Sequence, residues 1–276
     1  MKASRSFQHA DVSAFGFGFQ PIGKPRLFAY CFFVDGLLID TGQSRMRREV
    51  MDATANLPID QILITHHHED HNGNLKALQE RNQVPAYASP LCVELMRDPP
   101  KISFAQFLVW GKTEANFDIL TIEESIETPK YKFELILAPG HAPDMYCLYE
   151  RNEGWLFPAD LWVKQYIRYF MRPESMADQI DSIRKILELD FDVLFCSHNP
   201  QLKGGKDLMQ QKLQFLEDFY GRAAGLYAKG LGDKQIFKQM GLKEDRLTKL
   251  LSGGALAGIN MVRSVIRDEE RKQQSS

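Results

Sequence analysis

The chain has 276 residues, of which 44% are hydrophobic and 25% are charged, and its formal net charge is −2. This is the composition of an ordinary globular protein, long enough for one large domain or one domain with an appendage. The near-neutral charge gives no electrostatic reason to expect a nucleic acid or an anionic membrane as partner. No apolar run reaches the length of a bilayer span, the N-terminus lacks the apolar segment of a secretory signal, and the four cysteines form no C-x-x-C pair. We therefore expect a cytoplasmic protein with buried free thiols.

The first elements expected along the chain are strands. Residues 27–34 (LFAYCFFV) and 37–40 (LLID) are apolar runs on either side of Asp35-Gly36, which is a strong signal for a two-residue hairpin turn. GFGFQ, at residues 16–20, indicates a further strand before them. We expect a helix over residues 45–55.

The sequence is organised around residues 61–75, QILITHHHEDHNGNL. Ile62, Leu63 and Ile64 form a short apolar run, typical of a strand buried on both faces. Polar residues begin where this run ends, and good helix formers follow the Asn-Gly-Asn breaker cluster. A loop between a strand and a helix is where α/β proteins place their chemistry.

Four residues of this loop, His66, His68, Asp70 and His71, form the pattern H-x-H-x-D-H. Residues two apart on an extended backbone project to the same side, so His66 and His68 can reach one ion together. Asp70 and His71 are adjacent in a turning loop and can point to a neighbouring position. The spacing therefore leaves one metal site or two open. Imidazole and carboxylate ligands suit zinc, iron or manganese.

Three further residues near this loop are not expected to be metal ligands. His67 and Glu69 occupy the variable positions of the motif, and we expect packing or solvent contact for both. Asp40 closes the second arm of the hairpin. It either hydrogen-bonds a metal-ligating imidazole or caps the turn that it makes with Thr41 and Gly42.

Residues 101–116 (KISFAQFLVWGKTEAN) are the least regular segment of this half. Phe104, Phe107, Leu108 and Trp110 recur at helical spacing, which usually indicates core packing. Because the segment lies between the histidine loop and the next candidate ligand, it could equally form an apolar lid over the metals.

Three later residues also stand just past an apolar run. His141 follows FELILAPG, Asp160 follows WLFPA, and His198 follows FDVLFCS. Strand ends converge on one edge of the sheet in α/β active sites, so we expect these residues to meet the histidine loop.

Together, H-x-H-x-D-H, A-P-G-H, the aspartate after a short strand, the late S-H and the early LLIDTG (37–42) resemble the metallo-β-lactamase superfamily of hydrolases. The resemblance covers about residues 29–200. It implies an α/β fold, an αββα sandwich of two mixed β-sheets flanked by helices. It also implies two divalent metal ions per chain, with zinc expected and iron or manganese as alternatives. One ion would be held by His66, His68 and His141 and the second by Asp70, His71 and His198, with Asp160 bridging.

The resemblance implies a metallo-hydrolase that cleaves a small-molecule ester, thioester, lactone or amide, similar to the lactonase, glyoxalase II and lactamase branches. Two cations can share a hydroxide as nucleophile, and Asp70 is the candidate catalytic residue that orients it and passes its proton to the leaving atom. The alternatives are a phosphodiesterase or nuclease of the same superfamily, and an oxidoreductase resembling the mononuclear-iron persulfide dioxygenases. The sequence leaves the substrate and the oligomeric state open, a homodimer included.

Two segments near the ligands differ from the rest of the pattern. Residues 142–144 (Ala-Pro-Asp) replace the small residue and glycine of many relatives, so we expect a different loop shape there. In the run after Asp160, Lys164, Tyr166 and Arg168 either bind an acidic or carbonyl group of a substrate or form an amphipathic surface. Tyr166 and Tyr169 are the candidates for steadying a substrate.

The composition changes beyond residue 200. We expect a metal-hydrolase domain over residues 1–203 and a C-terminal helical cap over residues 204–276, packed on it. A clear amphipathic helix over residues 175–190 precedes this change. Residues 232–251 indicate two short helices with a Met-Gly-Leu turn, which suggests a DNA-binding helix-turn-helix, but the overall charge favours the cap.

Overall fold

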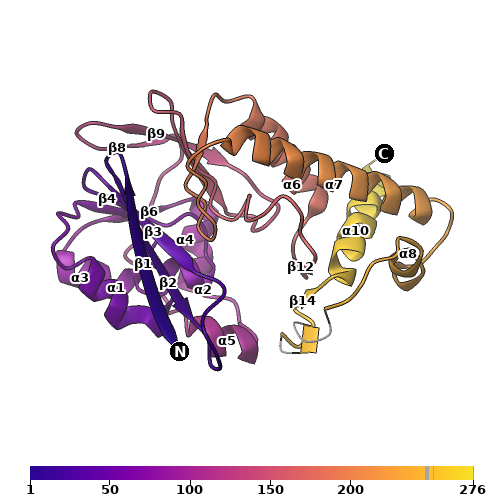
Figure 1. The fold of residues 1–276 in the computed structure, drawn as a ribbon, viewed down its shortest axis with the longest axis horizontal. Helices are drawn as coiled ribbons and strands as arrows, with labels where there is room; N and C mark the ends of the chain where they lie inside the picture. Colours follow the sequence, from indigo (N-terminus) through magenta and orange to yellow (C-terminus); the bar gives the residue numbers. More distant parts are fainter. Residues whose placement is uncertain (246–248, 251, 276) are drawn as a thin grey trace.

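The protein is described by a computed structural model that covers residues 1–245, 249–250 and 252–275. Within these residues, two β-sheets pack face to face and helices cover both outer faces (Figure 1). The fold class predicted from the sequence, an αββα sandwich, is confirmed.

The N-terminal sheet holds seven strands that lie in chain order. Its first three pairings are antiparallel and its last three are parallel. The expected Asp35-Gly36 turn joins β3 to β4, with positive φ at both residues. Strand β1 was not expected, because it is an edge strand with no buried residue and so carries little apolar alternation. The strands are β1 (Lys2–His9), β2 (Val12–Phe19), β3 (Ala29–Val34), β4 (Leu37–Ile39), β5 (Gln61–Leu63), β6 (Ala86–Ala88) and β7 (Leu120–Thr121).

The second sheet has the strand order β13-β11-β10-β9-β8. It is antiparallel except where β11 pairs with β13. A separate two-stranded sheet, β12-β14, links the middle of the chain to its C-terminal part. The strands are β8 (Ser125–Glu127), β9 (Lys132–Leu137), β10 (Tyr146–Glu150), β11 (Trp155–Phe157), β12 (Phe170–Met171), β13 (Val193–Leu194) and β14 (Leu256–Ala257).

The two sheets are joined by a core of alternate side chains. On β3, Phe32 faces the second sheet, whereas its neighbours Cys31 and Phe33 face the helices. Phe157 of β11 stacks on Phe195 with ring centroids 4.7 Å apart and meets Phe32 edge-on at 5.4 Å. Such buried aromatic pairs contribute a large part of the stability of a core.

Helices cover the outer faces of both sheets. Helices α1, α3 and α4 pack on the first sheet and α6 and α7 cover the second, whereas α8 and α10 pack against α7 (Figure 1). The helix expected over 175–190 is α6, which Ser175 caps by accepting from the Asp178 amide. The helices are η1 (Ser44–Met46, a 3-10 turn), α1 (Arg47–Ala53), α2 (Glu69–Asn72), α3 (Leu75–Asn82), α4 (Pro90–Arg97), α5 (Phe104–Trp110), α6 (Met176–Leu187), α7 (Gly205–Tyr227), α8 (Asp233–Gln239) and α10 (Ile259–Ser275).

The C-terminal part is helical as expected. Helix α8 is the first of the two short helices expected in residues 232–251, and the second falls partly on residues 246–248 and 251, outside the described residues. The boundary at residues 203 and 204 stays a prediction. All four cysteines are buried free thiols, as expected. In the described parts of the chain, no helix has the length and apolar character needed to cross a bilayer.

The aromatic core between the sheets generates a first prediction. Phe157→Ala, at a residue 1% exposed, should lower the free energy of unfolding by roughly 3–5 kcal/mol because it removes a ring and leaves a cavity. Urea denaturation measures the loss. Phe104→Ala, at a residue 77% exposed, is the matched control and should change stability by less than about 0.5 kcal/mol. Equal effects of the two substitutions would contradict this picture of the core.

Candidate metal centre

Polar side chains from five segments meet at one edge between the two sheets. Each segment directly follows a strand, namely β4, β5, β9, β11 or β13. Strand β4 is parallel to β5, and β9, β11 and β13 run in one direction, so the carboxyl ends of each set lie at the same edge. The residues are Asp40, His66 to His71, His141, Asp160 and His198.

Three imidazoles form a first triad. His66 Nε2 lies 3.1 Å from His68 Nδ1, which in turn lies 3.0 Å from His141 Nε2. All three nitrogens fall within 4.8 Å of one another, close enough for one ion to contact them all. The structure thus brings together three of the residues expected to share a metal.

Asp70, His71 and His198 form a second triad. His71 Nε2 lies 3.8 Å and His198 Nε2 lies 3.3 Å from Asp70 Oδ2, and the three donor atoms again fall within 4.8 Å. Helix α2 begins after His68, so Asp70 and His71 leave the extended backbone that carries His66 and His68. A third group, His66, His71 and Asp160, also has its donor atoms within 4.8 Å and shares a member with each triad, so the described residues offer overlapping positions for an ion.

Asp160 lies between the two triads. Its Oδ2 atom is 3.1 Å from His198 Nε2 and 3.4 Å from His141 Nε2, while its Oδ1 atom is 3.6 Å from His71 Nε2. The preceding residue, Ala159, has a φ of +47°, a left-handed conformation that is uncommon for a residue with a Cβ. This tight turn after β11 places the carboxylate where it touches a member of each triad.

Charge pairing determines the protonation of the second triad. Burial would lower the pKa of His71 and of His198, but nearby carboxylates, Asp70 first for His71 and Asp160 first for His198, raise both pKa values well above the usual value. Burial would raise the pKa of Asp160, but His198 and His71 hold it well below the usual value. The imidazoles of His71 and His198 are therefore attracted to the carboxylates of Asp70 and Asp160, whereas the two carboxylates repel each other.

Two histidines of the first triad, His66 and His68, behave differently, whereas His141 does not: burial would lower its pKa, but Glu174 and Asp160 raise it above the usual value. Burial lowers the pKa of His66 well below the usual value, and the neighbouring imidazoles lower it further. The pKa of His68 is lowered well below the usual value for the same two reasons. Both rings are therefore neutral near pH 7, which is the state in which an imidazole binds a metal.

Two atoms of the cluster are buried without a hydrogen-bond partner among the described residues. They are His71 Nε2 and Asp160 Oδ1. A buried polar atom without a partner is costly, and a metal ion would supply the missing partner for both. The donor atoms are imidazole nitrogens and carboxylate oxygens, which fit zinc, iron or manganese.

Asp40 lies on the Nδ1 side of the His66 and His71 rings, away from the Nε2 atoms that face the cluster. Its Oδ1 atom accepts from the Thr65 amide at 2.9 Å, and its Oδ2 atom accepts from the Thr65 hydroxyl at 2.9 Å and from His71 Nδ1 at 2.8 Å. Thr65 Oγ1 also lies 3.1 Å from His66 Nδ1. Of the two interpretations of Asp40, hydrogen bonding to an imidazole is therefore the one that the contacts support. These bonds leave Nε2 of His66 and of His71 facing the cluster.

His67 has a partner that the sequence did not indicate. The His67 amide donates to Asp144 Oδ2 at 2.8 Å, and His67 Nδ1 lies 2.8 Å from Asp144 Oδ1. Asp144 is fully buried, and its own carbonyl accepts from the Ser89 hydroxyl. His67 is half-buried and lies in none of the groups that could hold a metal, which agrees with the expected packing; in addition it braces the loop through Asp144. The unusual residue at position 144 was the one signal in the sequence.

Glu69 also packs as expected. It is 4% exposed, and burial, followed by the charge of Asp70, raises its pKa to about 7. Its carboxyl group also receives a hydrogen bond from Gln106, so it links the histidine loop to α5.

Helix α5 lies against the metal centre. The Trp110 ring is 6.2 Å from the His198 ring, and the Arg45 guanidinium donates to the Phe107 carbonyl. No residue of α5 is buried, and Phe104, Phe107 and Leu108 are exposed. The core interpretation of this segment is therefore wrong, and the position of α5 agrees with the lid interpretation.

The run after Asp160 lies largely at the surface. Lys164, Tyr166, Arg168 and Tyr169 are exposed, and Tyr166 packs edge-on against Phe215 of α7. This exposure agrees with an amphipathic surface, and a contact between these residues and a substrate stays a prediction.

The contacts of Asp40 generate a second prediction. Asp40→Ala should lower the free energy of unfolding of the metal-free protein by about 1–3 kcal/mol, because buried donors of Thr65 and His71 lose their acceptor. Urea denaturation in the presence of a chelator measures this change in the free energy of unfolding. Asp52→Ala removes an aspartate that is 73% exposed, and it should change stability by less than about 0.5 kcal/mol. An unchanged midpoint for Asp40→Ala would refute the bracing role.

Comparisons with known proteins agree with this geometry. A family model described as the metallo-beta-lactamase superfamily matches residues 25–198, which include both triads and Asp160. An uncharacterized protein of Aquifex aeolicus is 28% identical over 178 residues, 63% of this chain and 82% of that protein. A hydroxyacylglutathione hydrolase of Pseudoalteromonas translucida is 31% identical over 170 residues, 58% of this chain and 54% of the hydrolase. The chain thus spans about half the length of that hydrolase.

Solved structures show the same fold. A metallo-beta-lactamase from Pontibacter korlensis has a TM-score of 0.63 at 17% sequence identity, covering 78% of this chain and 99% of the lactamase. A flavoprotein from Thermotoga maritima has a TM-score of 0.61 at 16% identity, covering 81% of this chain and 62% of that protein.

Proposed function

Because the chain belongs to the metallo-beta-lactamase superfamily, we propose that it is a metal-dependent hydrolase of a small-molecule ester, thioester, lactone or amide. The observation that carries the proposal is the convergence of two triads on a shared aspartate, with His71 Nε2 and Asp160 Oδ1 buried and unsatisfied. That arrangement supports a dinuclear centre, with zinc as the expected metal.

In this proposal each triad holds one divalent ion. His66, His68 and His141 would hold the first, Asp70, His71 and His198 the second, and Asp160 would contact both. Two such ions, when bound, would polarise the scissile carbonyl and lower the pKa of an attacking water towards neutrality.

The side chains contribute the remaining steps. Burial would raise the pKa of Asp70, but His71 and His198 lower it, so that it remains a carboxylate near neutral pH. A carboxylate at the edge of the second triad can orient the attacking water, accept its proton and deliver that proton to the leaving atom. Asp70 is therefore the proposed catalytic residue.

The relatives favour an acyl substrate within the proposed range. Several curated relatives are hydroxyacylglutathione hydrolases, and the family match covers the whole ligand set. These relatives are 28–31% identical to the chain and support the reaction class. The leaving group of the substrate has to be identified by experiment.

The proposal is tested first by metal content. Elemental analysis of the purified protein should find about two zinc ions per chain, together with hydrolysis of a panel of small esters, thioesters and lactones. A chelator should abolish hydrolysis and added zinc should restore it. About one iron per chain without hydrolysis would instead favour the thiol-oxidising alternative.

Substitution of the ligands provides an independent prediction. His68→Ala or Asp70→Ala should abolish turnover while the fold is retained, since each removes a donor atom from one triad. Circular dichroism and urea denaturation check the fold. His9→Ala is the matched control, because His9 lies on β1, away from both triads, and should leave activity unchanged. Full activity of either ligand variant would reject the assignment.

A further inference from the structure

The two ring nitrogens of His141 face different surroundings. Nε2 lies 3.0 Å from His68 Nδ1 and 3.4 Å from Asp160 Oδ2, inside the metal centre. Nδ1 lies on the other side of the ring, 3.5 Å from Glu174 Oε2. An imidazole that binds a metal through one nitrogen usually donates its other N–H to a carboxylate, a carbonyl or water, and this bond orients the ring. Glu174 is the carboxylate that faces Nδ1 of His141.

The Glu174 carboxylate is held in its orientation. The residue is 7% exposed, its Oε1 atom accepts from the Met171 amide at 2.7 Å, and its Oε2 atom accepts from Gln179 Nε2 at 2.8 Å. Gln179 also packs on the loop that carries His141. A Cβ atom built at Gly140 would lie only 2.5 Å from the backbone nitrogen of Gln179. The carboxylate and the imidazole are thus parts of one tightly packed unit.

Helix α10 forms hydrogen bonds with residues 174–177, the segment that contains Glu174. Ser264 Oγ donates to the Glu174 carbonyl at 2.9 Å and accepts from the Met176 amide at 2.8 Å. One turn further along α10, Asp268 accepts from the Ala177 amide at 2.9 Å and from the Ser175 hydroxyl at 3.1 Å. Ser264 and Asp268 are both buried, and residues four apart lie on the same face of a helix.

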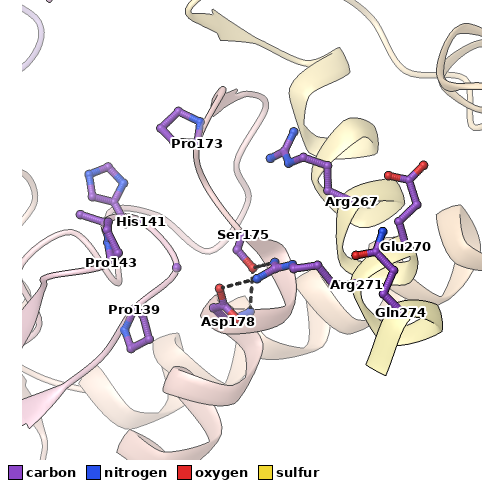
Figure 2. A pocket seen from close by; sticks show the side chains of 12 residues that line it. Pro139, His141, Pro143, Pro173, Ser175, Asp178, Arg267, Glu270, Arg271 and Gln274 are labelled. Carbon is purple, nitrogen blue, oxygen red and sulfur yellow. Dashed lines mark hydrogen bonds and ion pairs between the residues drawn. The ribbon is translucent and has the colours of Figure 1, made fainter. Parts of the chain in front are cut away.

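A cavity lies beside this connection. It has a volume of about 460 Å³ and separates the His141 loop from Arg267 and Arg271 of α10 (Figure 2). Ser175, whose amide donates to the Gly140 carbonyl at 2.9 Å, lies at its floor between the two. The hydrogen bonds that join α10 to the His141 loop therefore run through residues 174–178.

We infer that Glu174 is a positioning residue for His141, and that α10 acts on the first metal position by holding Glu174. The inference rests on the proposed metal centre. It makes the C-terminal helices part of the metal site, although the family match ends at residue 198.

Zinc affinity measured by chelator competition tests the role of Glu174. Glu174→Gln keeps the shape of the side chain and removes its charge, so one of the two zinc ions should bind about 10-fold more weakly. The visible spectrum of the cobalt(II)-substituted protein should change with it, because ligand geometry determines that spectrum. Glu150→Gln is the matched control, since Glu150 is also buried but its carboxylate accepts hydrogen bonds only from Asn152 and Glu153, in the turn after β10, among the described contacts. It should leave both ions unaffected.

Ser264→Ala tests the part played by α10. It should weaken the same zinc ion by a smaller factor, because it loosens Glu174 without removing it. If Glu174→Gln does not fold, this variant decides the inference by itself. Wild-type affinity and an unchanged cobalt spectrum in the folded variants would overturn the inference while leaving the proposed function intact. A wild-type protein that binds no divalent ion would overturn both.

Discussion

The carboxylate of Asp160 lies between the two triads, and the rest of the site depends on that contact. Charged groups are costly to bury unless they are paired or bind a metal. Asp160 approaches His141 of the first triad and His71 and His198 of the second within 3.6 Å. Burial would raise the pKa of Asp160, but the charge of His198, followed by that of His71, holds it well below the usual value. The left-handed turn at Ala159 that creates this contact is therefore a strained backbone feature with a structural purpose.

Three buried carboxylates brace the histidine-bearing loops from three different parts of the fold. Asp40 comes from the first sheet and supports His71, whereas Glu174 comes from the segment before α6 and faces His141. Asp144 lies just past His141 itself and reaches back to the loop after β5, where it binds His67. A metal site needs its ligands held to within a fraction of an ångström, and hydrogen bonds to such a supporting shell provide that precision.

Helices outside the main ligand segments also approach the candidate metal centre. The matched region ends at residue 198, before α7, α8 and α10 begin. Helix α10 nevertheless bonds to residues 174–177, and α5 places Trp110 beside His198. These two helices approach the same centre from different parts of the chain, and neither contributes a member of the triads.

The sequence by itself determined the order of strands around the histidine loop and the set of residues that meet, because apolar runs mark buried strands and the chemistry sits where they end. The αββα class followed from the resemblance of these motifs to the metallo-β-lactamase superfamily. The sequence could not determine that Asp144 pairs with His67, that Glu174 faces His141 or that α5 leaves the core. Each of these contacts joins residues distant in the chain or depends on how a loop bends, so local patterns do not identify the partner: the unusual residue at position 144 marked the loop but did not point to His67. Tertiary structure decided them, because only packing of the two sheets and the C-terminal helices brings those side chains within a hydrogen bond of one another.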